Sequence, residues 1–196
     1  QEPEPGTDVL LSQGLSSRLT SERKRSNLHF SDKGETYMTS PVHGSDPLWS
    51  LERGVSPLVC TAIHNGHHVR GDLIERFALG DAERLREEDP FTEYFIRDMP
   101  NRIVFHRSRF EIDLNRARDM AVYLRPEQAW GLDVWKEHLP APVIDKSHAV
   151  HDAYYGMLEH MLAGIEAMHG GFVLLDVHSY NHRRDGPENE PTDPRK

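Results

Sequence analysis

The sequence contains one cysteine, Cys60, among its 196 residues. A single cysteine cannot form an internal disulfide, so a disulfide-rich secreted scaffold is excluded and a reducing compartment, most simply the cytoplasm, is expected. The chain also lacks any apolar run near the roughly 18 residues that a membrane-spanning helix needs, so no membrane partner is expected. Residues 1–5 have neither the basic nor the apolar region of a secretory signal peptide.

Basic residues are the minority among the charged side chains. The chain has 23 Lys and Arg against 32 Asp and Glu, which gives a formal net charge of −9. An acidic protein repels phosphate groups, so nucleic acid is not expected as a partner. The short basic run at residues 23–25 is long enough for only one or two phosphate contacts. Small molecules or proteins remain as partners.

Polar residues dominate the first part of the chain. Residues 1–46 have no apolar period long enough to form a core, so we interpret them as a polar N-terminal extension. From residue 47 onward the pattern is that of a globular domain, with Trp49 expected to cover its core. The chain is therefore divided into the extension, 1–46, and one α/β domain, 47–196.

Hydrophobic periodicity predicts alternating strands and helices along the domain. Residues 58–63 and 172–177 are short, mostly apolar runs typical of buried strands, and residues 102–114 alternate as one or two strands do. Short helices are predicted at 72–77 and within 81–99. A longer helix is predicted to begin at the N-cap Ser147 and to end at Gly170. This succession indicates an α/β fold with a parallel or mixed sheet.

Polar side chains follow three of the predicted strands. His64 comes after the run at 58–63, Asn115 and Arg116 come after 110–114, and His178 comes after 172–177. In α/β sheets of this kind, ligands bind at the carboxyl ends of the strands. We therefore expect these side chains to form one site.

Three histidines are candidate metal ligands. A catalytic zinc takes three protein groups and keeps a fourth position open for water or substrate. His64 and His67 can bind one ion if the loop between them curls, and His178 would add a ligand from a separate strand. His68 is adjacent to His67 and is expected to point elsewhere. Because the chain has 13 histidines, a single pair is a weak signal, and the strand-end positions of His64 and His178 carry the prediction.

The pair Asn115 and Arg116 suits an anionic substrate. The guanidinium group is a planar fork that matches a carboxylate, and the asparagine amide adds a further donor. Asp113 is expected to orient a histidine or the arginine through a hydrogen bond. The alternative is that Asp113 and Arg116 form an ion pair that only stabilises the turn.

Three motifs in this order resemble the N-formylglutamate amidohydrolase family and, more distantly, the zinc carboxypeptidase and aspartoacylase superfamily. The resemblance spans residues 47–185. The motifs are His64-Asn65-Gly66-His67, Asp113-Leu114-Asn115-Arg116 and Asp176-Val177-His178-Ser179.

The resemblance implies a three-layer α/β/α fold with a central mixed, mostly parallel sheet. It also implies a hydrolase that cleaves the amide of a small N-acylated acidic amino acid, such as N-formylglutamate, with water activated by zinc or another divalent metal. His64 and His178 would be metal ligands, and Asn115 and Arg116 would hold a substrate carboxylate. The substrate site would also include Ser179 and Tyr180.

Two roles stay open within this resemblance. The superfamily has a glutamate ligand where this chain has His67, so the third ligand is either His67 or Glu111. Glu111 is also a candidate catalytic carboxylate, because a group near the metal must remove a proton from water. An arginine, either Arg107 or Arg109, would stabilise the oxyanion.

The superfamily takes its general base from a strand well past the histidine of the third motif, whereas this chain ends at Lys196. We therefore expect the hydrolase domain to be incomplete at its C-terminus, with further strands needed to cover the free edge of the strand at 172–177. If it is complete, the base must come from Glu111, Asp113 or Asp176.

Two other functions are compatible with these motifs. A protein that lacks the general base would keep the fold and bind an acidic ligand without turnover. A carboxypeptidase-like enzyme would use the same groups on peptides. Metal content measured together with turnover of N-acyl amino acids separates the non-catalytic function from the enzyme.

Overall fold

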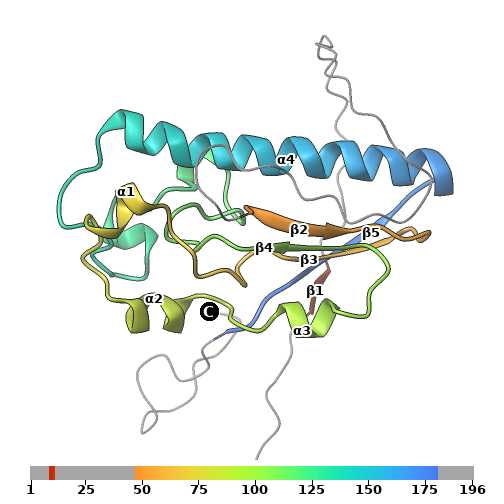
Figure 1. The fold of residues 1–196 in the computed structure, drawn as a ribbon, viewed down its shortest axis with the longest axis horizontal. Coiled ribbons are helices and arrows are strands. Elements are labelled where there is room, and N and C mark those ends of the chain that lie inside the picture. The colour runs from red at the N-terminus through yellow and green to blue at the C-terminus, as the bar shows by residue number, and fades with distance from the viewer. Residues whose placement is uncertain (1–8, 12–46, 181–196) are drawn as a thin grey trace, which may run out of the picture.

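A five-stranded sheet forms the centre of the protein (Figure 1). The structure is a computed structural model that describes residues 9–11 and 47–180. Across the sheet the strands follow the order β1-β5-β3-β4-β2. They are β1 (Val9–Leu11), β2 (Trp49–Glu52), β3 (Leu58–Ala62), β4 (Arg102–Phe105) and β5 (Val173–Val177).

The sheet is mixed, as predicted. The central strand β3 pairs in parallel with β4 and β5, whereas β2 and β1 pair antiparallel at the two edges. Two of these four pairs are parallel, so a mostly parallel sheet is not confirmed. The β5 edge that was expected to be free pairs with β1, where Val9 lies opposite Val177. A segment interpreted as a polar extension therefore adds a strand to the sheet.

β5 becomes more buried toward its carboxyl end. Val173 is 51% exposed, whereas Val177 is 7% exposed. The prediction of a buried strand therefore holds only at its carboxyl end. The buried end of β5 is the one that precedes His178.

The strand predicted at residues 110–114 is also wrong. β4 ends at Phe105, and residues 109–116 form turns and irregular backbone. All five side chains from Phe110 to Leu114 are at most 1% exposed. The segment alternates between apolar and charged residues because its charged groups enter buried ion pairs, not because one face of a strand meets water.

The helix α4 (Ala141–His169) crosses one face of the sheet (Figure 1). It begins six residues before the predicted N-cap, because Pro140 and a proline in the first turn start the helix there. Ser147 lies inside the helix instead and accepts a hydrogen bond of 2.6 Å from Arg70. The predicted end is confirmed: Gly170 has a φ of 77°, the left-handed conformation that closes many helices.

Short helices lie in the connections between strands. The helical region predicted at 81–99 is divided in two, because the segment around Pro90 leaves the helical path. The remaining helices are α1 (Gly71–Ile74), α2 (Asp81–Glu87), α3 (Glu93–Ile96), η1 (Arg118–Met120) and η2 (Pro126–Gln128). α2 and α3 lie on the side of the sheet opposite α4 (Figure 1).

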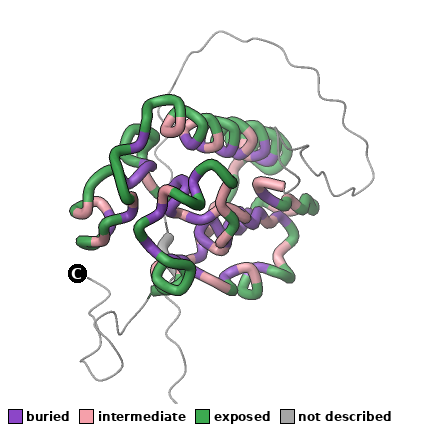
Figure 2. The backbone as a smooth tube through the Cα atoms, turned by 60° about the vertical axis from the view of Figure 1, so that its left-hand side comes forward, coloured by how far each residue is buried: buried purple, intermediate pink, exposed green. Residues whose placement is uncertain are grey.

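The larger core lies between the sheet and α4, whose outer surface is exposed (Figure 2). Trp49 is 4% exposed in this core, as predicted. A smaller cluster, with Cys60 and Ile96, lies on the α3 side. The described helices on that side are short, so the three-layer arrangement is not confirmed. None of the helices in the described residues is long and apolar enough to cross a membrane.

Candidate metal centre

The carboxyl ends of β3 and β5 bring two histidines together. β3 and β5 are parallel neighbours, so His64, two residues after β3, and His178, directly after β5, lie at the same edge of the sheet. The centroids of the two imidazole rings are 4.9 Å apart. The structure therefore brings the side chains of these two predicted ligands together.

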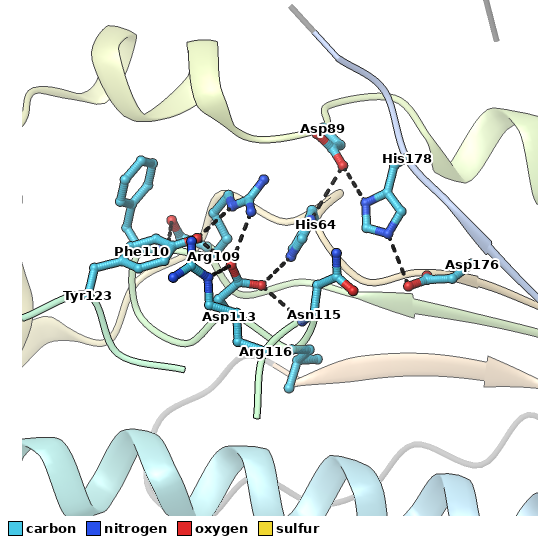
Figure 3. Close-up of polar contacts among 12 residues, drawn as sticks. His64, Asp89, Arg109, Phe110, Asp113, Asn115, Arg116, Tyr123, Asp176 and His178 are labelled. Carbon is cyan, nitrogen blue, oxygen red and sulfur yellow. Dashed lines mark hydrogen bonds and ion pairs between the residues drawn. The ribbon is translucent and has the colours of Figure 1, made fainter. Parts of the chain in front are cut away.

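Asp89 lies next to both histidines and forms a cluster of three candidate ligands with them. Its Oδ2 atom lies 2.8 Å from Nδ1 of His178 and 3.4 Å from Nδ1 of His64 (Figure 3). One ligand atom from each of the three residues lies within 4.8 Å of the others. Two imidazole nitrogens and one carboxylate oxygen form the type of donor set that holds a catalytic zinc.

The buried Nδ1 atom of His64 tests whether a metal fits here. His64 is 1% exposed, and among the described residues its Nδ1 has no hydrogen-bond partner, since the Asp89 oxygen is 3.4 Å away. A buried polar atom without a partner is unfavourable and calls for an explanation, such as an ion that the atom binds. The residues therefore fit a divalent metal, with His64, Asp89 and His178 as ligands.

Each histidine uses its other nitrogen to contact a carboxylate. Nε2 of His64 is 2.7 Å from Oδ1 of Asp113, and Nε2 of His178 is 3.0 Å from Oδ2 of Asp176. Asp176 is itself held by a 2.5 Å hydrogen bond from the hydroxyl of Thr61. Metal-binding histidines usually donate their second N–H to such a partner, which orients the ring. Both rings therefore direct Nδ1 toward Asp89.

These contacts shift the pKa values of the group. Burial opposes ionisation of Asp89, but the hydrogen bond to His178 and the nearby imidazole of His64 outweigh it and lower the pKa of Asp89 to about 2. Burial likewise opposes protonation of His178, but Asp176 and Asp89 raise its pKa to about 9. A bound cation would replace the proton on His178 and interact with the ionised Asp89.

Asp113 is the centre of a buried network that supports His64. Its carboxylate lies 3.0 Å from Nη2 of Arg109 and 3.3 Å from Nε of Arg116, and it accepts a hydrogen bond from the hydroxyl of Tyr123. Burial opposes its ionisation, but His64, Arg109 and Tyr123 hold the pKa of Asp113 well below its usual range. Asp113 therefore stays ionised and keeps His64 in one orientation.

Asp89 reaches the centre from the segment between α2 and α3. Its backbone N–H donates a 3.1 Å hydrogen bond to the carbonyl of His64, and its carbonyl accepts one of 2.9 Å from the hydroxyl of Thr92. The first bond attaches the segment to the loop after β3, and the second stabilises the turn within the segment. They hold Asp89 above the two histidines in Figure 3.

The model of the N-formylglutamate amidohydrolase family matches residues 56–195, more than half of the chain. The chain belongs to the N-formylglutamate amidohydrolase family. The family name supports an amidohydrolase role, and the matched region contains every residue of the candidate metal centre. No curated protein and no solved structure shows a significant match to the chain.

His67 and Glu111, the two residues predicted as the third metal ligand, are not part of the cluster of His64, Asp89 and His178. Nδ1 of His67 is 2.5 Å from Oε2 of Glu88. Glu111 is 1% exposed and accepts hydrogen bonds from the backbone and the guanidinium of Arg70, at 2.8 and 3.3 Å. The third position of the group is filled by Asp89.

The two arginines predicted to stabilise an oxyanion have different surroundings. Arg109 contacts Asp113, the hydroxyl of Tyr123 and the carbonyl of Glu87, so it belongs to the network behind His64. Arg107 follows β4, where it forms an isolated parallel bridge with His68. Its role stays a prediction.

The predicted substrate-binding residues lie near the same edge. The guanidinium of Arg116 packs 4.6 Å from the ring centroid of Tyr123 and donates a 2.7 Å hydrogen bond to the carbonyl of Gln128. The side chain of Asn115 points toward the side of the cluster where His64 and His178 lie (Figure 3). Ser179 and Tyr180 are exposed and directly follow His178.

Asp113 makes the contacts that both alternatives required. It orients His64, as expected, and it also pairs with Arg116. The ion pair does not exclude a substrate role, because the side chain of Arg116 remains 28% exposed.

Sequence patterns did not identify Asp89 as a ligand. It lies in the acidic run Glu87-Glu88-Asp89, which resembles a solvated helix end, and no motif marks it. The sequence did indicate that Asp176 and His178 could pair, because residues two apart in a strand lie on the same face.

Gly66 lets the loop after β3 approach the chain after β4. A Cβ atom at this position would overlap with backbone atoms of His106 and Arg107. The close neighbour of Gly66 is therefore the protein's own chain. The loop that contains His64 therefore depends on a residue without a side chain.

A surface cavity of about 280 Å³ lies beyond Tyr123, lined by residues 123–126, 133–135 and 137–139. None of the metal-centre residues lines it. Tyr123 lines this cavity and donates a hydrogen bond to Asp113.

Proposed function

We propose that this protein is a metal-dependent amidohydrolase that cleaves the amide bond of an N-acylated acidic amino acid, such as N-formylglutamate. One observation carries the proposal. His64 and His178 direct Nδ1 toward the same oxygen of Asp89, while a carboxylate holds Nε2 of each ring. This arrangement occurs in a chain of the N-formylglutamate amidohydrolase family.

The proposed ion is zinc, held by His64, Asp89 and His178. Other divalent ions of the first transition row accept the same nitrogen and oxygen donors. When bound, the ion would supply Lewis-acid activation of the scissile carbonyl and of a water molecule. The neighbouring residues would orient the ligands and bind the substrate.

Arg116 would bind the carboxylate of the substrate. Its side chain is held at one end by Asp113 and Gln128 and stays 28% exposed, so a guanidinium in a fixed position faces the surface beside the centre. Asn115 would add an amide donor next to it. Together they favour an acidic over a neutral N-acyl amino acid, because a guanidinium pairs with a carboxylate through two hydrogen bonds.

The test combines metal analysis with an activity assay. Elemental analysis of the purified wild type is expected to find about one equivalent of metal, and release of formate from N-formylglutamate is expected to stop with a chelator and to return with zinc. Asp89→Asn is expected to lower metal affinity by at least roughly ten-fold, because a neutral amide replaces an ionised ligand. The matched control is Asp98→Asn, since Asp98 is 87% exposed.

Two outcomes would contradict this function. Full metal content in Asp89→Asn would remove Asp89 from the centre. Stoichiometric metal without turnover of any N-acyl amino acid would favour the non-catalytic ligand-binding protein.

A further inference from the structure

His67 and Glu88 form a hydrogen-bonded pair that has no part in holding the metal. Nδ1 of His67 is 2.5 Å from Oε2 of Glu88, and the other carboxylate oxygen accepts a hydrogen bond from the hydroxyl of Ser108. The side chain of Glu88 is 0% exposed, whereas that of His67 is 35% exposed. A buried carboxylate therefore holds one nitrogen of an imidazole that reaches the surface.

This pair lies beside the metal centre. Asp89 donates its backbone N–H to the carbonyl of His64, and the preceding residue, Glu88, contacts His67. These two contacts hold residues 64–67 and 88–89 side by side. His64 and His67 thus come from one loop, and Asp89 and Glu88 come from one neighbouring segment that contacts it.

Other carboxylates around the centre already have partners. Asp113 contacts His64, Arg109, Arg116 and Tyr123. A carboxylate with so many donors is a poor proton acceptor, and its pKa is held well below the usual range.

Asp176 and Glu111 also have hydrogen-bond partners. Asp176 accepts a hydrogen bond from Thr61 and lies against His178, and Glu111 is buried against Arg70. Hydrolysis of an amide nevertheless needs a group that takes a proton from water and delivers one to the departing nitrogen. Among the described neighbours of the centre, the imidazole of His67 fits this need.

We propose that His67 is the proton-transfer residue of the hydrolysis, and this rests on the function proposed above. Its Nδ1–H donates to Glu88, which leaves the lone pair of Nε2 directed outward. As the water oxygen bonds to the scissile carbonyl carbon, its proton moves to Nε2. As the C–N bond breaks, Nε2 returns a proton to the nitrogen, and a carboxylic acid and an amine are formed.

Glu88 acts as a positioning residue in this scheme. It fixes the tautomer of His67 and stabilises the imidazolium that forms during the reaction, as buried carboxylates do for catalytic histidines elsewhere. Other charged groups near the pair are the exposed Asp81, which is within electrostatic range of His67, and Arg84, whose Nη1 is 4.0 Å from Oε1 of Glu88.

The experiment compares His67→Ala and Glu88→Gln with His68→Ala in the full chain loaded with zinc. His68 is the adjacent histidine and is exposed, so it controls for the loss of an imidazole from the same loop. Each variant is assayed on N-formylglutamate and on a p-nitrophenyl ester, with zinc content and circular dichroism measured in parallel. Imidazole is then added to each assay.

For His67→Ala we expect full zinc content, an unchanged KM and a kcat lower by roughly 10²- to 10⁴-fold, the usual contribution of acid–base catalysis. Added imidazole should restore part of the activity, because the missing side chain reached the surface. Glu88→Gln should lower kcat with KM unchanged, and His68→Ala should behave as wild type.

Three results would overturn the proposal. They are loss of zinc from His67→Ala, a kcat within a few-fold of wild type, and lost activity that imidazole does not restore while circular dichroism is unchanged. If wild type cleaves the ester but no N-acyl amino acid, the proposed substrate fails, and the role of His67 is decided by kcat and imidazole rescue on the ester. A wild type that cleaves neither compound overturns both.

Discussion

Each imidazole of the metal centre has two different neighbours. Nε2 of His64 faces Asp113 and Nε2 of His178 faces Asp176, while both Nδ1 atoms face Asp89. A carboxylate accepts a hydrogen bond and cannot donate one when ionised, so it holds the proton on Nε2. A cation that binds between the rings would displace the proton from Nδ1 of His178 and use the Nδ1 lone pair of each ring. At the scale of single residues, the carboxylates behind the rings determine which nitrogen can be a ligand.

Arg116 provides a prediction at the same scale. We expect Arg116→Lys to raise KM for N-formylglutamate by roughly 10-fold or more, because lysine cannot reproduce the planar fork that binds a carboxylate. KM for a neutral analogue, such as N-formylglutamine, should change much less. Steady-state kinetics on both substrates measure the difference. Equal increases would show that Arg116 serves only its ion pair with Asp113.

At the scale of elements, α4 supports the segment that carries Asp113. Nε2 of His151 lies 3.0 Å from the carbonyl of Arg116, and the hydroxyl of Tyr155 donates to the carbonyl of Leu114. These bonds satisfy backbone groups in a buried segment that has no strand partner. The helix therefore replaces the sheet as the support for this part of the site.

The close packing of the loop after β3 leads to a prediction about stability. Gly66→Ala is expected to lower the free energy of unfolding by at least about 3 kcal/mol, because its Cβ would overlap with the backbone of residues 106–107. Metal affinity should fall as well, since the loop holds His64. Urea denaturation and metal titration measure the two effects.

The matched control for this change is Gly156→Ala. Gly156 lies in α4 with nothing within 4 Å of its added Cβ, so alanine should stabilise the helix by up to about 1 kcal/mol. Equal midpoints for the Gly66 variant and wild type would contradict the close approach of the two chains.

For the whole molecule, the ionised groups of the centre determine how stability varies with pH in the metal-free protein. His178 has its pKa raised from 6.5 to about 9, so its contribution is complete below pH 6.5 and is lost as pH rises through 9. Asp89 has its pKa lowered from 3.8 to about 2, so its contribution is complete above pH 3.8 and is lost as pH falls through 2. The stability that these two groups contribute is therefore greatest between pH 3.8 and pH 6.5.

We predict that the free energy of unfolding of the metal-free protein falls by up to about 3 kcal/mol as pH rises past 6.5 toward 9 and above. Urea denaturation in the presence of a chelator measures it. His178→Asn should abolish this decrease, since asparagine does not titrate. Saturating zinc should reverse the trend, because metal binding requires a deprotonated imidazole. A metal-free protein whose stability is constant over this range would contradict the contacts of His178.

The sequence was sufficient for the features that depend on local order. The apolar runs of β3 and β5 end at His64 and His178, and parallel strands place such ends at one edge of a sheet. The end of α4 was likewise predictable from Gly170, because glycine adopts a positive φ readily. The family followed from three short motifs and is confirmed over residues 56–195.

Features that depend on contacts between distant segments were decided by the tertiary structure. Asp89 is one of 32 acidic residues, and only the folded chain, which places its carboxylate against Nδ1 of His64 and of His178, identifies it as a ligand. The strand expected at residues 110–114 is irregular because its carboxylates are buried against side chains from other elements. Periodicity describes which face of an element is apolar, but the partner of a buried charge comes from elsewhere in the chain, and only folding brings the two together.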